Sequence, residues 1–158
     1  MLSSSNKFQL LKAAEDTVAK AYAPFSSFRV GAAVLTEAGN IFVGCNVENR
    51  SYGLTSCAER NAIAAAVASE GGENMKIRAI AAVSQGQVSC SPCGACRQCI
   101  DEFSGSETLV LFYAEGKIQE RSIAQLLPDR FKLSIESQEM GSRGAEVQGR
   151  YGARGKIE

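Results

Sequence analysis

The stretch SCAERNAIAAAVASEGG, residues 56–72, decides the fold, because the other predicted elements can be arranged around it. It is rich in alanine, contains no helix breaker before its end and closes on two glycines. This pattern predicts a helix over about 57–70 with a glycine stop, and Ser56 stands where an N-cap residue would. Its first turn carries Cys57 and Glu59. The helix that organises the chain therefore also holds a possible metal ligand beside a carboxylate.

Apolar runs on both sides of this helix predict strands. We expect a first helix, capped by Ser5 or Asn6 and running to about Tyr22, with Phe8, Leu11, Val18 and Tyr22 on its apolar face. A strand over 28–36, a hairpin turn over 37–40 and a strand over 41–47 follow, before the helix over 57–70. After that helix we expect a strand over 77–83, a helix over 92–103, a strand over 108–113 and a short helix over 122–127. This order predicts an α/β fold, a three-layer α-β-α sandwich with a mixed, roughly five-stranded sheet. Residues 1–140 are expected to form one domain. Residues 141–158, where Gly, Arg, Glu and Gln replace apolar residues, are expected to be a disordered tail.

The composition excludes several classes of protein. The 158 residues contain 17 basic and 17 acidic side chains, so no net field attracts a polyanion, which argues against nucleic acid as a partner. The longest apolar run, residues 62–68, is too short to span a bilayer, so no membrane partner is expected. The first residues lack the pattern of a signal peptide. We therefore predict a cytoplasmic protein that keeps its six cysteines reduced.

A second stretch, PCGAC at residues 92–96, repeats the arrangement of a cysteine at a helix start. Ser91 and the proline that follows it predict the N-cap and first position of that helix. Cys93, like Cys57, would lie in a first turn, where free N–H groups and the helix dipole favour thiolate. Cys96 follows three residues later, so the two sulfurs project from one helical face.

Three such thiolates in a chain without histidine indicate a metal site built from sulfur alone. A zinc ion with three protein ligands keeps its last position for water, whose pKa it can lower to about 7. Glu59 is near enough in sequence to accept the proton of that water. Arg60 and Arg97, each beside a ligand segment, are candidates to offset the excess negative charge.

Other interpretations of the same residues stay open at this point. Ser56 to Glu59 also matches a capping box, which is purely structural. Cys93 and Cys96 alone could be a redox pair or half of a structural zinc site. The cysteine run over 90–99 resembles that of bacterial ferredoxins, although its last spacing is one residue short and Ile100 replaces the proline. Three further cysteines can be small buried hydrophobes, namely Cys45, Cys90 and Cys99.

Four motifs in order resemble the cytidine deaminase family in its compact homotetrameric form, across roughly residues 8–131. They are APFSSFRVGAA at 23–33, GCNVEN at 44–49, CAER at 57–60 and PCGACRQ at 92–98. The resemblance implies one zinc ion per subunit on Cys57, Cys93 and Cys96, with Glu59 as the proton shuttle. Arg60 matches the arginine that hydrogen-bonds a ligand sulfur. The implied activity is hydrolytic deamination of cytidine and 2'-deoxycytidine to uridine and 2'-deoxyuridine.

The resemblance also implies how a nucleoside binds. Asn46 and Glu48 match the pair that reads the ribose, and alternate residues at a strand end do point to one face. Phe28 and Ala58 match residues around the pyrimidine. Two aromatics match residues near the subunit interfaces of a homotetramer, namely Tyr52 and Phe131.

Two rival functions remain at this stage. One is a related small-molecule deaminase of the blasticidin S type. The other is a non-catalytic zinc-stabilised module, which a fourth cysteine ligand, Cys90 or Cys99, would support. Editing of nucleic acid is disfavoured by the balanced charge.

Overall fold

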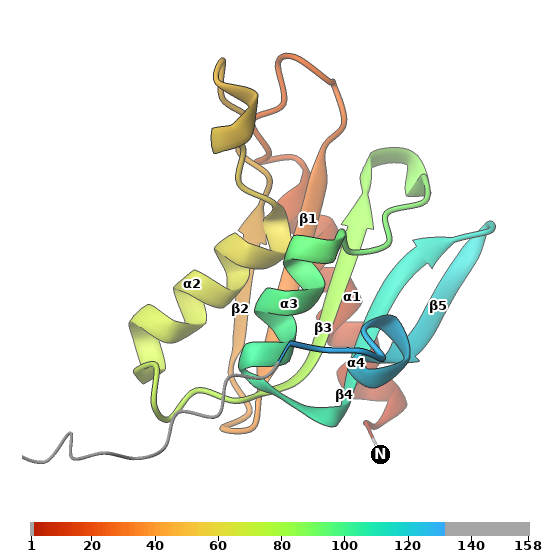
Figure 1. Ribbon diagram of the computed structural model, residues 1–158. Coiled ribbons are helices and arrows are strands. Elements are labelled where there is room, and N and C mark those ends of the chain that lie inside the picture. Colours follow the sequence, from red (N-terminus) through yellow and green to blue (C-terminus); the bar gives the residue numbers. More distant parts are fainter. Residues whose placement is uncertain (1, 132–158) are drawn as a thin grey trace, which may run out of the picture.

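A single mixed sheet forms the middle layer of the molecule (Figure 1). The structure, a computed structural model, describes residues 2–131. The strand order is β2-β1-β3-β4-β5; β3 and β4 are parallel and the other pairs are antiparallel. The elements are α1 (Ser4–Val18), β1 (Val30–Thr36), β2 (Ile41–Cys45), α2 (Ala58–Glu70), β3 (Ile77–Ser84), α3 (Gly94–Glu102), β4 (Ser104–Ala114), β5 (Lys117–Ser122) and α4 (Ile123–Leu126), with short 3-10 turns at Tyr52–Leu54 and Gln85–Gln87.

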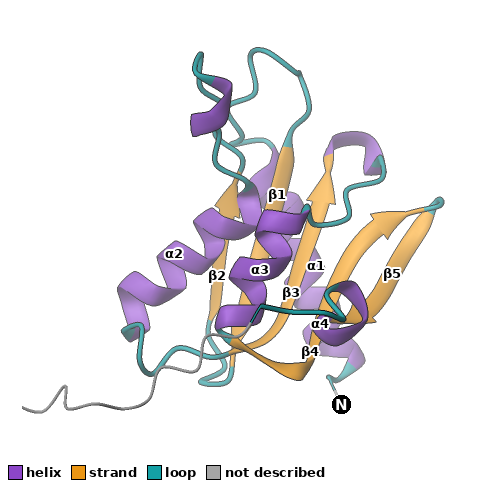
Figure 2. Cartoon of the chain, in the orientation of Figure 1, coloured by secondary structure: helices purple, strands orange, loops and turns teal. Residues whose placement is uncertain are grey.

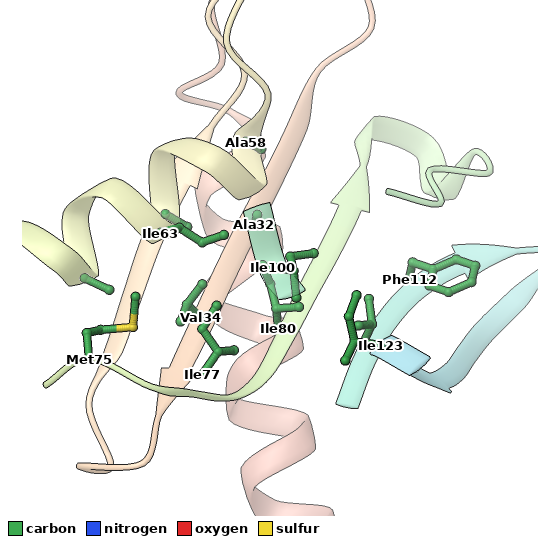
Figure 3. Close-up of a cluster of buried hydrophobic side chains, with 13 residues drawn as sticks. Ala32, Val34, Ala58, Ile63, Met75, Ile77, Ile80, Ile100, Phe112 and Ile123 are labelled. Carbon is green, nitrogen blue, oxygen red and sulfur yellow. The ribbon is translucent and has the colours of Figure 1, made fainter. Parts of the chain in front are cut away.

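Helices cover both faces of this sheet, as Figure 2 shows: α1 lies behind it, and α2, α3 and α4 lie in front. The alternation of β1 explains the two layers, because successive side chains point to opposite faces. Ala33 and Leu35 pack with Leu10 of α1, whereas Ala32 and Val34 pack into the larger core under α2 and α3 (Figure 3). The predicted three-layer α-β-α sandwich with a mixed five-stranded sheet is confirmed.

Two glycines allow the helices to approach the strands closely. A Cβ atom on Gly44 of β2 would lie 2.4 Å from the backbone nitrogen of Ala62 and 2.6 Å from the carbonyl oxygen of Ala58. A Cβ atom on Gly31 of β1 would lie 2.2 Å from the carbonyl oxygen of Ala14 in α1. No side chain fits at such distances, so glycine is required at both positions. The start of α2 is thereby seated directly on the end of β2.

The first helix differs from the prediction in its bounds and in its buried face. It begins after Ser3, whose hydroxyl accepts from the N–H of Asn6, and it ends at Val18. Tyr22 lies beyond it, because its backbone pairs with residues 46–48 instead of continuing the helix. The buried residues of α1 are Leu10, Ala14 and Thr17, whereas the predicted Phe8 is 69% exposed.

Four strands are predicted individually from the sequence, and β5 is not among them. Its sequence, KIQERS, has no apolar alternation, and of its residues Gln119 alone is buried. Among residues 2–131 it is an edge strand, which pairs with β4 and with no other strand.

Two further sequence expectations concern the ends of the chain and membranes. The predicted domain end at residue 140 and the tail over 141–158 lie outside the described residues. Within residues 2–131, no helix has the length and apolar character needed to cross a membrane.

Candidate metal centre and substrate cavity

Three cysteine sulfurs meet where α2 and α3 begin. Cys57 directly precedes α2, Cys93 directly precedes α3, and Cys96 lies in the first turn of α3. Their sulfur atoms all lie within 4.8 Å of one another. Helix starts carry free N–H groups and partial positive charge, which favour thiolate. The predicted cysteine group therefore comes together from two segments that lie 36 residues apart between Cys57 and Cys93.

The predicted helix caps need correction. Cys57 and Cys93 themselves occupy the N-cap positions, and neither makes a side-chain cap hydrogen bond. Ser56 is held in extended backbone by two hydrogen bonds to Val47, at 2.9 and 3.0 Å. The hydroxyl of Ser91 accepts from the guanidinium of Arg97 at 3.0 Å. Both serines thus make tertiary hydrogen bonds, and the cysteines occupy the N-cap positions in their place.

The electrostatics of the three sulfurs fit a cation. Hydrogen bonds from the thiols of Cys96 and Cys93, together with the positive charge of Arg60, lower the pKa of Cys57 from 9.0 to about 5. The same hydrogen bond raises the pKa of Cys96, because its thiol is the donor to the Cys57 thiolate. Crowded sulfurs that share protons in this way can be deprotonated together only if a cation neutralises them. The donor set of three cysteines therefore fits zinc.

The other cysteines near this centre stay outside the sulfur group. Among residues 2–131, the group that could hold a metal contains Cys57, Cys93 and Cys96 but neither Cys90 nor Cys99. The thiol of Cys90 donates to the carbonyl oxygen of Ala82 at 3.3 Å. A closed four-cysteine site, which a purely structural zinc would favour, is not what the described residues form.

Beside the sulfurs lies a cavity of about 180 Å³, here called the inner cavity. Its lining residues lie at or just before the start of β1, just after β2, and in the segments that lead into α2 and α3. They are Phe28, Val30, Asn46, Thr55, Cys57, Ala58, Glu59, Cys90, Ser91 and Cys93. Glu59 is only 5% exposed. Burial, and then the negative charge of Cys57, raise the pKa of its carboxyl group. A buried carboxyl group beside a metal centre, with its pKa raised in this way, is suited to proton transfer.

The capping-box interpretation of Ser56 and Glu59 is wrong. The hydroxyl of Ser56 donates to the side chain of Asn61 at 2.7 Å, and the start of α2 has no side-chain cap. Glu59 thus lies in the cavity instead of closing a helix end.

A second cavity of about 370 Å³, the outer cavity, adjoins the first and shares Thr55 with it. Its other lining residues are Phe25, Ser26, Glu48 and Tyr52. The carboxylate of Glu48 accepts from the backbone N–H groups of Phe25 at 2.8 Å and Ser26 at 3.3 Å, and from the Ser26 hydroxyl. The Ser26 side chain is the main cause that lowers the pKa of Glu48. The aromatic rings of Phe25 and Tyr52 meet edge to face, with centroids 6.0 Å apart.

The predicted substrate-binding residues divide between the two cavities. Phe28, Asn46 and Ala58 line the inner cavity. Glu48 and Tyr52 line the outer cavity. The amide of Asn46 accepts from the N–H of Val30 and donates to the carbonyl of Phe28, both at 2.8 Å. It therefore also fixes the strand start that carries Phe28.

Phe131 lines neither cavity. It is 71% exposed, and the preceding residue, Arg130, pairs with Asp101 of α3 at 2.8 Å. Within one subunit, the structure does not bring Phe131 to the predicted site.

Sequence reasoning overlooked some residues and assigned another wrongly. Thr55 and Ser91 line the cavities, and the one signal for them was their closeness in sequence to Cys57 and Cys93. Arg97 was a candidate to offset thiolate charge. Its guanidinium instead donates to the carbonyls of Pro92 and Leu126, at 2.8 and 3.0 Å, so it ties the start of α3 to α4.

Comparisons with known proteins agree with this geometry. Residues 4–112 match the family model described as the cytidine and deoxycytidylate deaminase zinc-binding region. A cytidine deaminase from Sporosarcina psychrophila is 50% identical over 113 residues, which cover 71% of this chain and 81% of the relative. The crystal structure of cytidine deaminase from Burkholderia pseudomallei has a TM-score of 0.71 at 42% identity, covering 82% of this chain and all of that chain. That of Mycobacterium tuberculosis has a TM-score of 0.71 at 41% identity, covering 81% and 98%. The chain therefore belongs to the cytidine and deoxycytidylate deaminase family of zinc-binding proteins.

Proposed function

We propose that this protein catalyses the hydrolytic deamination of cytidine and 2'-deoxycytidine to uridine and 2'-deoxyuridine, with release of ammonia. The observation that carries the proposal is the inner cavity. It joins a buried carboxyl group, Glu59, to two cysteines of the metal centre and to an aromatic ring, Phe28. The relatives named above, each called a cytidine deaminase, support the same reaction.

The metal centre and Glu59 would divide the chemistry. Cys57, Cys93 and Cys96 would hold one zinc ion per subunit. The chemistry that zinc would supply there is a bound water made acidic enough to serve as the nucleophile for C4 of the cytosine ring. Glu59 would take the proton that the water gives up and deliver it to N3 of the ring. It would then take the remaining proton of the hydroxyl group added at C4 and give it to the amino group, so that the C4–N bond breaks, a carbonyl forms at C4 and ammonia leaves. Burial raises the pKa of Glu59 above its ordinary value, which makes its carboxylate a better proton acceptor than an exposed one. Arg60 would limit the negative charge that the three thiolates leave behind.

The two cavities suit the two halves of a nucleoside. The inner cavity is smaller and would take the pyrimidine against the ring of Phe28, beside Ala58. The sugar would reach past Thr55 towards Glu48 in the outer cavity. A carboxylate has about four acceptor positions, and three donors already occupy positions on Glu48. One position remains for a sugar hydroxyl, and the amide of Asn46 likewise keeps unused capacity.

We also propose that four copies of the chain assemble, with sites near the subunit interfaces. Tyr52 is 75% exposed at the outer cavity, and Phe131 is exposed as well. Burial of an aromatic side chain lowers the free energy, so a neighbouring subunit that covers these two side chains would stabilise the assembly. Light scattering should then give a mass of four times 16.8 kDa.

The six cysteines, all free thiols, support the predicted cytoplasmic location.

A substrate comparison tests the function. Zinc-loaded protein is incubated with cytidine, 2'-deoxycytidine, free cytosine or blasticidin S, and ammonia release is measured together with the ultraviolet change of the base. We expect turnover of both nucleosides and much slower turnover of cytosine, which lacks the sugar. Absence of ammonia from both nucleosides would refute the proposal. Preferred turnover of blasticidin S would favour the related small-molecule deaminase.

A further inference from the structure

The two halves of the inner cavity come from different elements that must keep a fixed distance. Cys57 and Glu59 belong to the start of α2, whereas Asn46 follows the end of β2. A proton shuttle and a substrate-binding group can cooperate only if this distance is kept to a fraction of an ångström. The backbone contact at Gly44 presses the two elements together, but it supplies no directional bond.

One side chain, Asn61, supplies directional bonds to both elements. Its amide nitrogen donates to the carbonyl of Cys45 at 2.8 Å, one residue before Asn46. Its amide oxygen accepts from the hydroxyl of Ser56 at 2.7 Å, one residue before Cys57. Its own backbone N–H bonds to the carbonyl of Cys57 at 3.2 Å.

The place of Asn61 makes these bonds effective. Its carbonyl carbon lies at the point where α2 touches Gly44, 2.8 Å from where a Cβ atom would be. The side chain is half-buried, so its hydrogen bonds face less competition from water than those of an exposed residue. Because Ser56 is also held in extended backbone by Val47, the peptide that leads into Cys57 is fixed from two sides.

We propose that Asn61 is a positioning residue, which fixes the metal-binding turn of α2 relative to the strand end that binds the nucleoside. The proposal rests on the proposed function for its effect on turnover, but its effect on metal retention does not depend on that function. Without the side chain of Asn61, the peptide before Cys57 loses one of its two attachments, and Cys57 can move away from the sulfurs of α3.

A matched control lies at the other end of the same helix. The amide of Asn40, in the β1–β2 turn, donates to the carboxylate of Glu70 at 2.8 Å. Asn40→Ala therefore removes an asparagine bond between α2 and the β1–β2 hairpin, far along the helix from the metal centre. Asn61→Ala removes the bonds at the start of the helix. Both variants should unfold at somewhat lower temperature than the wild type.

The test measures zinc release to a chromogenic chelator and steady-state turnover of cytidine. Groups that orient a metal ligand typically contribute roughly 10–100-fold to metal affinity or activity. We expect Asn61→Ala to release zinc about tenfold faster and to lower kcat about tenfold. We expect Asn40→Ala to stay within about twofold of the wild type in both, since it only weakens the fold.

A second pair of variants keeps the proposal testable if Asn61→Ala folds poorly. Ser56→Ala removes one of the two side-chain bonds of Asn61, and it should speed zinc release by a smaller factor. The double variant should be no worse than Asn61→Ala, because Ser56 acts through Asn61. The proposal is overturned if Asn61→Ala leaves zinc release or kcat unchanged, if Asn40→Ala matches it, or if Ser56→Ala adds fully to it. If the wild type does not deaminate cytidine, the proposed function fails, and the comparison of zinc release still decides the role of Asn61.

Discussion

The inner and outer cavities share Thr55 but differ in how their acidic side chains are held. Glu59 in the inner cavity is buried, and its pKa is raised by that burial. Glu48 in the outer cavity receives three hydrogen bonds, and its pKa is lowered mainly by the Ser26 hydroxyl. Burial favours the neutral form of a carboxyl group, and donors favour the charged form.

This difference assigns different tasks to two residues of the same class. A carboxyl group whose pKa is raised by burial accepts a proton more readily and is suited to proton transfer, whereas one whose charged form is stabilised by donors is suited to binding hydroxyl groups. Changes in the inner cavity should therefore lower kcat. Changes in the outer cavity should raise KM.

The largest effect is expected from Glu59→Gln, which keeps the size of the side chain and removes its ability to exchange protons. We expect kcat for cytidine to fall by roughly 100- to 10,000-fold, with little change in KM. Glu73→Gln, at an exposed position after α2, is the control and should retain wild-type activity. A near-normal kcat for Glu59→Gln would contradict the assignment of proton transfer to Glu59 and of the chemistry to the inner cavity.

Next come the metal ligands. The purified Cys96→Ser variant should contain less zinc than the wild type. Its activity should fall by more than the roughly 10–100-fold expected when a group that only orients a metal ligand is removed. Cys99→Ser, three residues further along α3, should keep one zinc ion per subunit and normal turnover, because its sulfur lies outside the metal-binding group. Metal analysis and activity of both variants provide the test. Equal zinc loss in both would point to a different ligand set.

A smaller effect is expected from Glu48→Gln in the outer cavity. Loss of a charge-assisted hydrogen bond to a sugar hydroxyl should raise KM about tenfold and leave kcat within about threefold of the wild type. Ser26→Ala is the companion variant: it removes one of the bonds to Glu48 but keeps the carboxylate, so it should raise KM by a smaller factor than Glu48→Gln. A loss confined to kcat in Glu48→Gln would contradict the assignment of Glu48 to binding.

The smallest effect concerns the pH dependence of KM. The pKa of Glu48 lies below its ordinary value of 4.5, so the folded protein favours its ionised form. The contribution of this carboxylate is therefore complete above pH 4.5 and is lost only as the pH falls through the lowered value. We expect KM for cytidine to stay level from about pH 8 down to about pH 5. A rise in KM that begins near pH 6 would show that Glu48 is not held as described.

Much of the site could be predicted because its strongest signals are local. Cys93 and Cys96 are three residues apart on one helix, and Glu59 follows Cys57 by two, so short-range spacing already groups them. The helix caps could not be predicted in the same way. Serine is a more common N-cap residue than cysteine. However, the backbone of Ser56 pairs with Val47, nine residues earlier, and the hydroxyl of Ser91 accepts from the guanidinium of Arg97 in α3. Neither contact can be predicted from the residues next to the serine.

Long-range contacts also explain the errors in the fold. The near-helical spacing of Phe8, Leu11 and Val18 predicted one apolar face for the first helix. The helix is instead oriented so that Leu10 and Ala14 are buried, with Ala14 against Gly31 of β1, and Phe8 is exposed. Strand β5 is held by its hydrogen bonds to β4, and its side chains show no pattern of burial that a sequence could reveal. The role of Arg97 depended on the carbonyl of Leu126, which lies in α4.

The sequence by itself determined the order of the longer helices and of four of the five strands, the presence of cysteines at two helix starts in a chain without histidine, and the carboxyl group two residues after Cys57. Each of these depends on residue types and on spacing within one short segment. Tertiary structure alone decided that Glu59 is buried while Glu48 is bound by donors, that Thr55 joins two cavities, and that Asn61 ties α2 to β2. The physical reason is that burial and hydrogen-bond partners are properties of the surroundings of a residue. Those surroundings are assembled only when distant segments pack together.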